Sequence, residues 1–355
     1  RYAVDRSREF AWIGRSEAPV DLEAIVTGRE IYSRDMMVPG MLYGRVVRPP
    51  HPGARLAKAD VEAAKLLDPV VDVIVDESEN RVGVLTEDPS ALEPAAAAIA
   101  LEWHGGVVVE QAELERELDV ERALARDDFE HTADSEGDPL RTSEAEVHRL
   151  RKRYDTPLWA HAAMEPRSGV VSVNPEAVEV WTASQDPWYL EGLVAKVTGR
   201  RREEVILHNL RMGGGFGGRK RCQATLEAAW LSSEVGRPVR VQWSREDEFR
   251  DNTFQPPFSH FIDAGIDAKG RLTHWLHDFT ACPIGFDSAT IPDGLHWLAD
   301  LVADPGTRRG ALTPYRVSDR RTRFSDLRIP IHTGQWRGLG AAPNTTAIEL
   351  SLIHI

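Results

Sequence analysis

Short apolar runs, many of them rich in β-branched residues, recur over the first hundred positions and again after position 154. Pro39-Gly40 precedes the first run and Pro49-Pro50 ends it, which predicts a strand between two turns. Alanine-rich segments have the composition of helices instead. The pattern predicts an α+β protein with strands at 41–47, 70–75, 81–85, 169–173, 178–182, 205–207 and 239–243, and helices at 94–101 and 223–231.

The chain has 355 residues, the usual length of two or three domains. An acidic stretch, 109–149, is predicted to be a linker or an exposed helical excursion. We therefore expect an upstream linker at 1–24, a compact α+β unit at 25–108 and a second domain at 150–349. Residues 350–355, Leu-Ser-Leu-Ile-His-Ile, resemble a translated sequencing adapter, so we interpret them as a tail and the chain as a fragment.

The composition of the chain disfavours several classes of function. Hydrophobic residues make up 42% and charged residues 28%, as in an ordinary globular protein. The net charge of −13 disfavours a nucleic-acid binder, and no apolar run approaches the roughly 20 residues of a membrane span. Two cysteines, Cys222 and Cys282, cannot build a four-cysteine zinc or iron-sulfur site. We expect no metal ligands here, and any electrons must be carried by another chain.

The sharpest local feature is a loop at 213–221, Gly-Gly-Gly-Phe-Gly-Gly-Arg-Lys-Arg, between a predicted strand and a predicted helix. Glycines let the backbone approach a ligand closely and adopt positive φ angles. Three cations at the start of a helix oppose its dipole, which favours a bound anionic group nearby. The loop therefore predicts a binding site.

The same loop satisfies the dinucleotide pattern G-x-G-x-x-G through Gly213, Gly215 and Gly218. Glu246 and Asp247 follow the next predicted strand, roughly 30 residues on instead of the usual ~20. On the residues alone, an NAD(P)-dependent dehydrogenase and a site for another anionic cofactor are equally supported. A non-catalytic subunit is the third hypothesis.

Several motifs follow one another over nearly the whole chain, and their order resembles the molybdopterin-binding large subunits of the xanthine dehydrogenase and aldehyde oxidoreductase family. The branch with isoquinoline 1-oxidoreductase β subunits is especially similar, although Ile25 and Glu30 depart from the family's opening. The motifs are Val26-Thr27-Gly28 to Arg48-Pro49-Pro50, 161–166 (HAAMEP), 184–187 (SQDP), the glycine loop, 244–247 (SRED) and 335–340 (QWRGLG).

The resemblance implies an α/β hammerhead domain at 25–108 and a first molybdopterin cofactor-binding domain at 150–349, truncated before the second. It implies a molybdenum hydroxylase large subunit that oxidises an N-heterocycle or an aldehyde with oxygen from water. The molybdenum would be held by molybdopterin, either in its simple form or as the cytosine dinucleotide. The protein would then supply hydrogen bonds and shape, not metal ligands.

The resemblance also implies partners. Electrons would pass to a separate small [2Fe-2S] subunit, with a cytochrome or flavin protein as a further partner. The family's general base is a glutamate in a later domain, and no motif before Ile355 matches it. We therefore expect this chain to be inactive alone.

Residue by residue, the resemblance assigns catalytic roles to Gln185 and Arg337. Gln185 would hydrogen-bond an oxygen on molybdenum, and Arg337 would orient the substrate. Lys220 stands where purine-oxidising relatives have an acidic residue, which disfavours a purine. The implied cofactor-binding residues are Gln185, Gly214, Gly215, Phe216, Gly217, Gly218 and Arg337, and the implied substrate contacts are Lys220 and Arg337. We interpret His161 and Glu165 as a structural polar pair.

Overall fold

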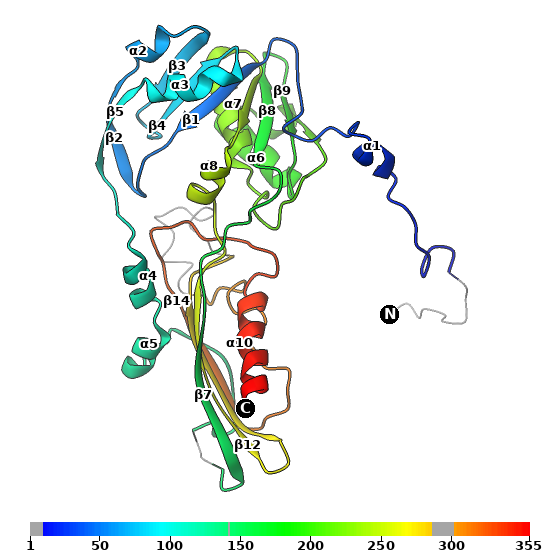
Figure 1. Ribbon diagram of the computed structural model, residues 1–355, viewed down its shortest axis with the longest axis vertical. Helices are drawn as coiled ribbons and strands as arrows, with labels where there is room; N and C mark the ends of the chain where they lie inside the picture. Colours follow the sequence, from blue (N-terminus) through cyan, green and yellow to red (C-terminus); the bar gives the residue numbers. More distant parts are fainter. Residues whose placement is uncertain (1–9, 141–142, 286–301) are drawn as a thin grey trace.

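The computed structural model describes residues 10–140, 143–285 and 302–355. The molecule is elongated, with one sheet in its upper part, a second sheet in its lower part, and a thin N-terminal arm to one side (Figure 1). The arm carries the short helix α1 (Leu22–Val26). The mixture of strands and helices confirms the predicted α+β class. Residues 1–9 of the predicted upstream linker lie outside the described residues.

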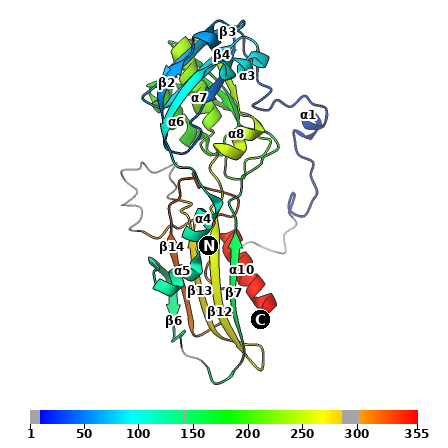
Figure 2. The same ribbon diagram turned by 60° about the vertical axis from the view of Figure 1, so that its left-hand side comes forward.

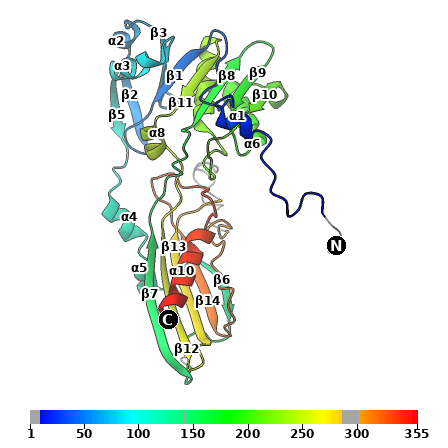
Figure 3. The same cartoon turned by 45° about the vertical axis from the view of Figure 1, so that its right-hand side comes forward.

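The upper sheet has seven strands in the order β10-β9-β8-β11-β1-β4-β3 (Figure 3). Strand β1 pairs in parallel with β11, with Leu42 opposite Val239 and Gly44 opposite Val241. The strands are β1 (Leu42–Val47), β3 (Val70–Asp76), β4 (Arg81–Thr86), β8 (Ser168–Val173), β9 (Val178–Thr182), β10 (Val205–Asn209) and β11 (Val239–Gln242). All the predicted strands are present. Strands from both sides of the domain boundary predicted near residue 108 lie in this one sheet.

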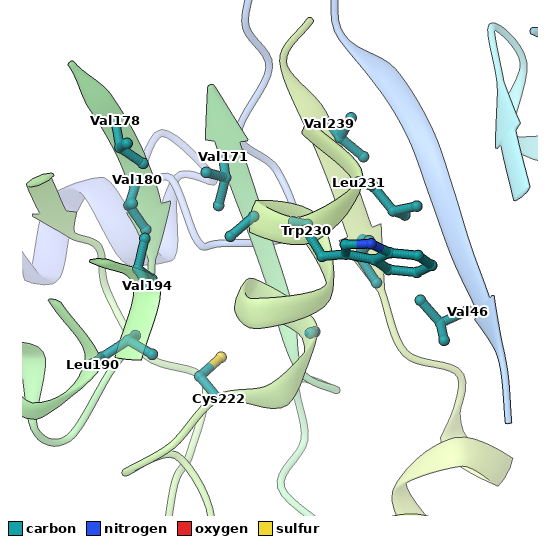
Figure 4. Packing of buried hydrophobic residues seen from close by; sticks show 14 of the residues in the cluster. Val46, Val171, Val178, Val180, Leu190, Val194, Cys222, Trp230, Leu231 and Val239 are labelled. Atoms are coloured by element: carbon teal, nitrogen blue, oxygen red, sulfur yellow. The ribbon is translucent and has the colours of Figure 1, made fainter. Parts of the chain in front are cut away.

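The main core lies between this sheet and two helices, α6 (Pro187–Thr198) and α7 (Gln223–Val235). Trp230 and Leu231 of α7 belong to this core together with valines of β8, β9 and β11 (Figure 4). A Cβ at Gly44 would lie 2.6 Å from Leu231 Cδ1, and one at Gly83 only 2.3 Å from Leu231 Cδ2. These glycines let α7 approach β1 and β4 closely, which is why the β-rich N-terminal segment joins this core.

Smaller elements surround the upper sheet. Residues Ala100 and Leu101, predicted as helix, instead lie in a strand, because they pair with Asp60 and Ala59 of the neighbouring strand. The elements are β2 (Ala54–Asp60), β5 (Ala100–Gly105), α2 (Glu62–Lys65), α3 (Leu92–Ala97), α8 (Arg245–Arg250) and the 3-10 turns Pro89–Ala91 and Arg202–Glu204.

The lower sheet has five strands in the order β6-β14-β13-β12-β7 (Figure 2). The described part of segment 109–149 is structured: it forms two helices, β6 and the start of β7. The elements are α4 (Gln111–Glu117), α5 (Val120–Arg126), β6 (His131–Glu136), β7 (Glu146–Thr156), β12 (Phe258–Asp267), β13 (Leu272–Ala281), β14 (Arg320–Asp326) and α10 (Ala341–His354).

Helix α10 lies along the lower sheet and contacts β12 and β7 (Figure 3). Ala347 and Ile348 of α10 pack against Ile262 and Ala264 of β12. The helix continues through residues 350–354, and Leu352 and Ile355 pack against the same cluster. Among the described residues, no helix is long and apolar enough to cross a membrane.

Two buried histidines of the lower sheet are expected to make the fold sensitive to acid. His260 Nδ1 lies 3.1 Å from His277 Nε2, and His277 Nδ1 lies 3.1 Å from Ala311 O. Burial lowers the pKa of His277 to about 4, and it holds the pKa of His260 well below its usual range. Both are therefore neutral in the fold near neutral pH.

Between the ordinary histidine pKa and about pH 4, the unfolded state binds more protons than the fold does. We therefore expect stability to fall as the pH drops from about 6.5 to 4, by roughly 3 kcal/mol for His277. Urea unfolding of wild type and His277→Gln at pH 7.5 and 4.5 checks this, because the difference separates the His277–His260 pair from the other titrating groups. The variant should lose less stability on acidification, and exposed His51→Gln should match wild type. Equal acid sensitivity in all three proteins would contradict the prediction.

Candidate functional site

Gln185 lies between β9 and α6 and holds the glycine loop in place. Its Oε1 accepts hydrogen bonds from Gly217 N at 2.9 Å and Arg219 N at 3.2 Å. Its backbone N donates to Arg219 O at 3.0 Å. The next residue, Asp186, caps α6 by accepting from Tyr189 N. Within the described part of the chain, Gln185 Nε2 makes no hydrogen bond, so this donor is free to face a ligand.

The glycine loop connects β10 to α7, as predicted. A Cβ at Gly215 would lie 2.7 Å from Gln185 Oε1, and one at Gly218 would lie 2.8 Å from His161 Cγ. Gly217 has φ +103°, and its Cβ would lie 2.3 Å from Gln335 O. Contacts within this chain are thus sufficient to require glycine at Gly217, where the neighbour is backbone and φ is positive, whereas at Gly215 and Gly218 the close neighbours are side chains.

A second loop, 335–340, lies against the first and leads into α10, which begins in the middle of the molecule (Figure 1). Arg337 N donates to Phe216 O at 2.8 Å. The Arg337 side chain is exposed and forms no ion pair with any described residue. Its guanidinium is therefore available to a ligand.

The two loops and Gln185 line a cavity of about 400 Å³ that is open to solvent. The structure thus brings together four residues that the sequence singled out: Gln185, Phe216, Gly217 and Arg337. Lys220 is not among the residues that line this cavity. Its Nζ lies instead 5.2 Å from the centre of the Tyr189 ring. The cavity is lined by Gln185, Phe216, Gly217, Gln335, Trp336, Arg337, Gly338 and Leu339.

Glu165 is buried and is hydrogen-bonded to the glycine loop. Its Oε1 accepts from Ser33 Oγ at 2.7 Å, and its Oε2 accepts from Gly213 N at 2.9 Å. The carboxylate also pairs with the buried Arg219 at 3.2 Å. Glu165 therefore ties the N-terminal segment to the loop. His161 has different partners, so the two residues act separately and not as a pair.

Sequence reasoning missed a buried ion pair behind the loop. Arg167, 1% exposed, pairs with Glu248, 3% exposed, and Arg167 N donates to Glu248 Oε1 at 2.7 Å. Arg167 Nη2 donates to Gly218 O and to Asn252 Oδ1, each at 2.5 Å. Arg167 directly follows the HAAMEP motif, and Glu248 directly follows the SRED motif. Their places next to these motifs were the only sign of the ion pair in the sequence.

Residues with strained backbone angles cluster in and around the loops that line this cavity. Ala162, Phe216, Cys222 and Leu339 have φ between 45° and 55°, in the left-handed region that their side chains rarely adopt. Ala162 lies in the 161–166 motif, Phe216 in the glycine loop, Leu339 in loop 335–340 and Cys222 at the start of α7. Such strain persists only where the surrounding structure imposes it, and it clusters at functional sites.

Ala162→Gly is expected to stabilise the protein by about 0.5 to 1 kcal/mol, because Ala162 is exposed and glycine adopts φ +48° without strain. Ala112→Gly is the matched control: this alanine is exposed in α4, and its replacement should destabilise by a similar amount. Chemical unfolding midpoints check both. A loss of stability in both variants would show that Ala162 carries no strain.

The dinucleotide interpretation does not fit the sheet. A dinucleotide-binding unit places the strands before and after its first helix side by side and parallel. Here β9 and β8 separate β10 from β11, and β8 is antiparallel to β11. The Asp247 carboxylate is also engaged, since Oδ2 accepts from Ser244 N at 2.8 Å. We therefore do not propose a nicotinamide site.

The groups at the cavity suit an anionic cofactor that brings its own metal. No three His, Cys, Asp or Glu side chains of the described ranges form a possible metal site. Backbone held by glycines, the Gln185 amide and the Arg337 guanidinium are all present instead. These groups fit molybdopterin, which needs hydrogen bonds and shape from the protein.

Comparisons with known proteins agree. Residues 124–285 match the family described as "Molybdopterin cofactor-binding domain", beginning within the segment predicted as a linker. The chain is 27% identical to isoquinoline 1-oxidoreductase subunit beta of Brevundimonas diminuta, over 89% of this chain and 43% of that protein. It is 24% identical to the nicotinate dehydrogenase large molybdopterin subunit of Eubacterium barkeri, over 98% of this chain and 90% of that protein.

Solved structures show the same fold. Quinoline 2-oxidoreductase from Pseudomonas putida 86 matches with a TM-score of 0.73 at 18% identity, over 96% of this chain and 48% of that chain. CO dehydrogenase from Oligotropha carboxidovorans matches with a TM-score of 0.71 at 17% identity, over 95% of this chain and 48% of that chain. The chain thus spans about half the length of these structural relatives.

These findings confirm the resemblance: residues 124–285 match the molybdopterin cofactor-binding domain, and most of the chain is similar to subunits of molybdopterin-dependent oxidoreductases. Isoquinoline 1-oxidoreductase and nicotinate dehydrogenase subunits are among the proteins that it resembles.

Proposed function

We propose that the whole protein is the large subunit of a molybdenum hydroxylase that oxidises an N-heterocycle or an aldehyde and passes electrons to a small [2Fe-2S] subunit. The convergence of Gln185, the glycine loop and Arg337 on one cavity supports this most directly. The bound molybdenum cofactor supplies the oxidation and the water-derived oxygen. The names of two relatives, isoquinoline 1-oxidoreductase and nicotinate dehydrogenase, favour an N-heterocycle.

The chain's own residues orient the cofactor and the substrate. Gln185 uses its oxygen to hold the loop, so only its Nε2–H groups remain to donate to a ligand. The Arg337 guanidinium offers a planar, permanently charged donor that can orient a polar substrate and stabilise developing negative charge. The fixed backbone of Phe216 and Gly217 keeps these two groups at one cavity. Lys220 remains a predicted substrate contact, and a cation in place of a carboxylate disfavours a purine.

The deciding experiment is metal and pterin analysis of the full-length protein purified with its neighbouring subunits. The proposal expects one molybdenum and one pterin per large subunit, iron only with the small subunit, and release of CMP on acid hydrolysis if the cofactor is the cytosine dinucleotide. NADH-like absorbance without molybdenum would favour the dehydrogenase. Absence of both cofactors from the intact complex would favour a non-catalytic subunit.

A further inference from the structure

A buried histidine lies between the two loops of the site. His161 is 7% exposed, and its Nε2 lies 2.8 Å from Gln335 O. This is the carbonyl that a Cβ at Gly217 would strike. Two residues further along the chain, Arg337 N is bound to Phe216 O. One carbonyl, held by one imidazole, therefore lies between the glycine loop and Arg337.

The other ring nitrogen of His161 is fixed from behind. Asn252 Nδ2 lies 3.2 Å from His161 Nδ1, and Asn252 Oδ1 accepts from Arg167 Nη2 at 2.5 Å. The same Arg167 nitrogen donates to Gly218 O at 2.5 Å. The hydrogen bonds thus form a continuous path from Gln335 through His161, Asn252 and Arg167 back to the glycine loop.

The geometry sets the proton position on the ring. A carbonyl only accepts, so Nε2 must carry the hydrogen that it donates to Gln335. Asn252 Oδ1 faces the donor Arg167, so Asn252 Nδ2 donates to the bare Nδ1. Burial and, to a smaller extent, the nearby Arg167 lower the pKa of His161 to about 4, although the Gln335 carbonyl and Glu248 favour the protonated ring. The ring is therefore neutral near neutral pH. A neutral imidazole of one tautomer is therefore held in place.

We infer that His161 is a positioning residue: through the Gln335 carbonyl it holds the loop that carries Arg337 at a fixed place opposite Gln185. The inference rests on the proposed function only where it concerns turnover. It differs from a packing role, because packing requires the shape of the ring, whereas positioning requires a donor at Nε2. An amide side chain can replace that donor, and an apolar side chain cannot.

The test compares His161→Gln with His161→Leu in the full chain. In His161→Leu, hydrogen exchange of amides 335–339, and of Arg337 N in particular, should accelerate at least about tenfold, which corresponds to one lost hydrogen bond of about 1.4 kcal/mol. His161→Gln should restore most of the protection. His277→Leu, a buried histidine of the lower sheet, should lower global stability without selective exchange at 335–339.

The holoenzyme supplies the second readout. His161→Leu should retain molybdenum and raise KM several-fold more than it lowers kcat, because Arg337 is displaced while Gln185 stays in place; His161→Gln should restore KM. Unchanged exchange at 335–339 in His161→Leu, or a His161→Gln variant indistinguishable from His161→Leu, would overturn the inference. Should His161→Leu not fold, Asn252→Ala takes its place, because it removes the partner of Nδ1 and leaves the ring. Exchange is measured without molybdenum, so its outcome is separate from failure of the proposed function.

Discussion

Gln185→Ala is expected to lower turnover on the order of 100-fold in the intact enzyme, about 3 kcal/mol of transition-state stabilisation. The variant removes the free Nε2–H donor at the reacting centre. It also removes the acceptor that holds Gly217 N and Arg219 N, so part of the molybdenum should be lost as well. Turnover is therefore expressed per bound molybdenum.

Gln185→Glu separates the two roles of this side chain. A carboxylate keeps the acceptor for the loop and lacks the donor, so we expect the same loss of turnover per bound molybdenum. Gln111→Ala, an exposed glutamine on α4, is the control and should behave as wild type. Wild-type kcat at full molybdenum occupancy in Gln185→Glu would refute the role of the donor.

Gly217→Val is expected to remove most of the cofactor and with it the activity. At φ +103° a β-branched residue is strongly strained, and its Cβ would overlap the Gln335 carbonyl. The glycine loop and loop 335–340 must then separate, while the lower sheet should stay folded. Molybdenum content, circular dichroism and turnover of the full complex check this.

The matched control is Gly192→Ala in α6, where a new Cβ meets nothing within 4 Å. It should retain full molybdenum content and stabilise the helix slightly. The dinucleotide interpretation leaves Gly217 as a free position, so a Gly217→Val variant with normal activity would revive it. Gly213→Ala is a poor discriminator, because its Cβ would lie 2.5 Å from Glu165 Cβ under either interpretation.

The strands and the glycine loop could be predicted from the sequence because their signals are local. Runs such as 178–182 alternate or cluster apolar residues, and a loop of five glycines has few structural uses. Residues 100–101 were assigned wrongly because alanine favours helices, whereas pairing with β2 decides the outcome in the fold. The segment 109–149 was interpreted from its charge, although α5 packs on β12 and β13, and β6 and β7 are strands of the lower sheet.

The supports of the site could not be predicted, because they join residues far apart in the chain. Gln335 lies 174 positions after His161, and Glu248 lies 81 after Arg167. No local pattern specifies such pairs. Gln185 and Arg337 were named through a family resemblance, and the residues alone gave no reason to place them at one cavity.

The parallel pairing of β1 with β11 has a consequence for how this protein can be divided. A piece that starts after residue 108 would lack β1, β3 and β4, so β11 would become an open edge with a row of unsatisfied backbone groups. Leu231 and Val239 would lose the cover that Leu42 and Gly44 provide. The excised cofactor domain would therefore be prone to self-association. The N-terminal strands cover its open edge, so the two parts must be expressed together.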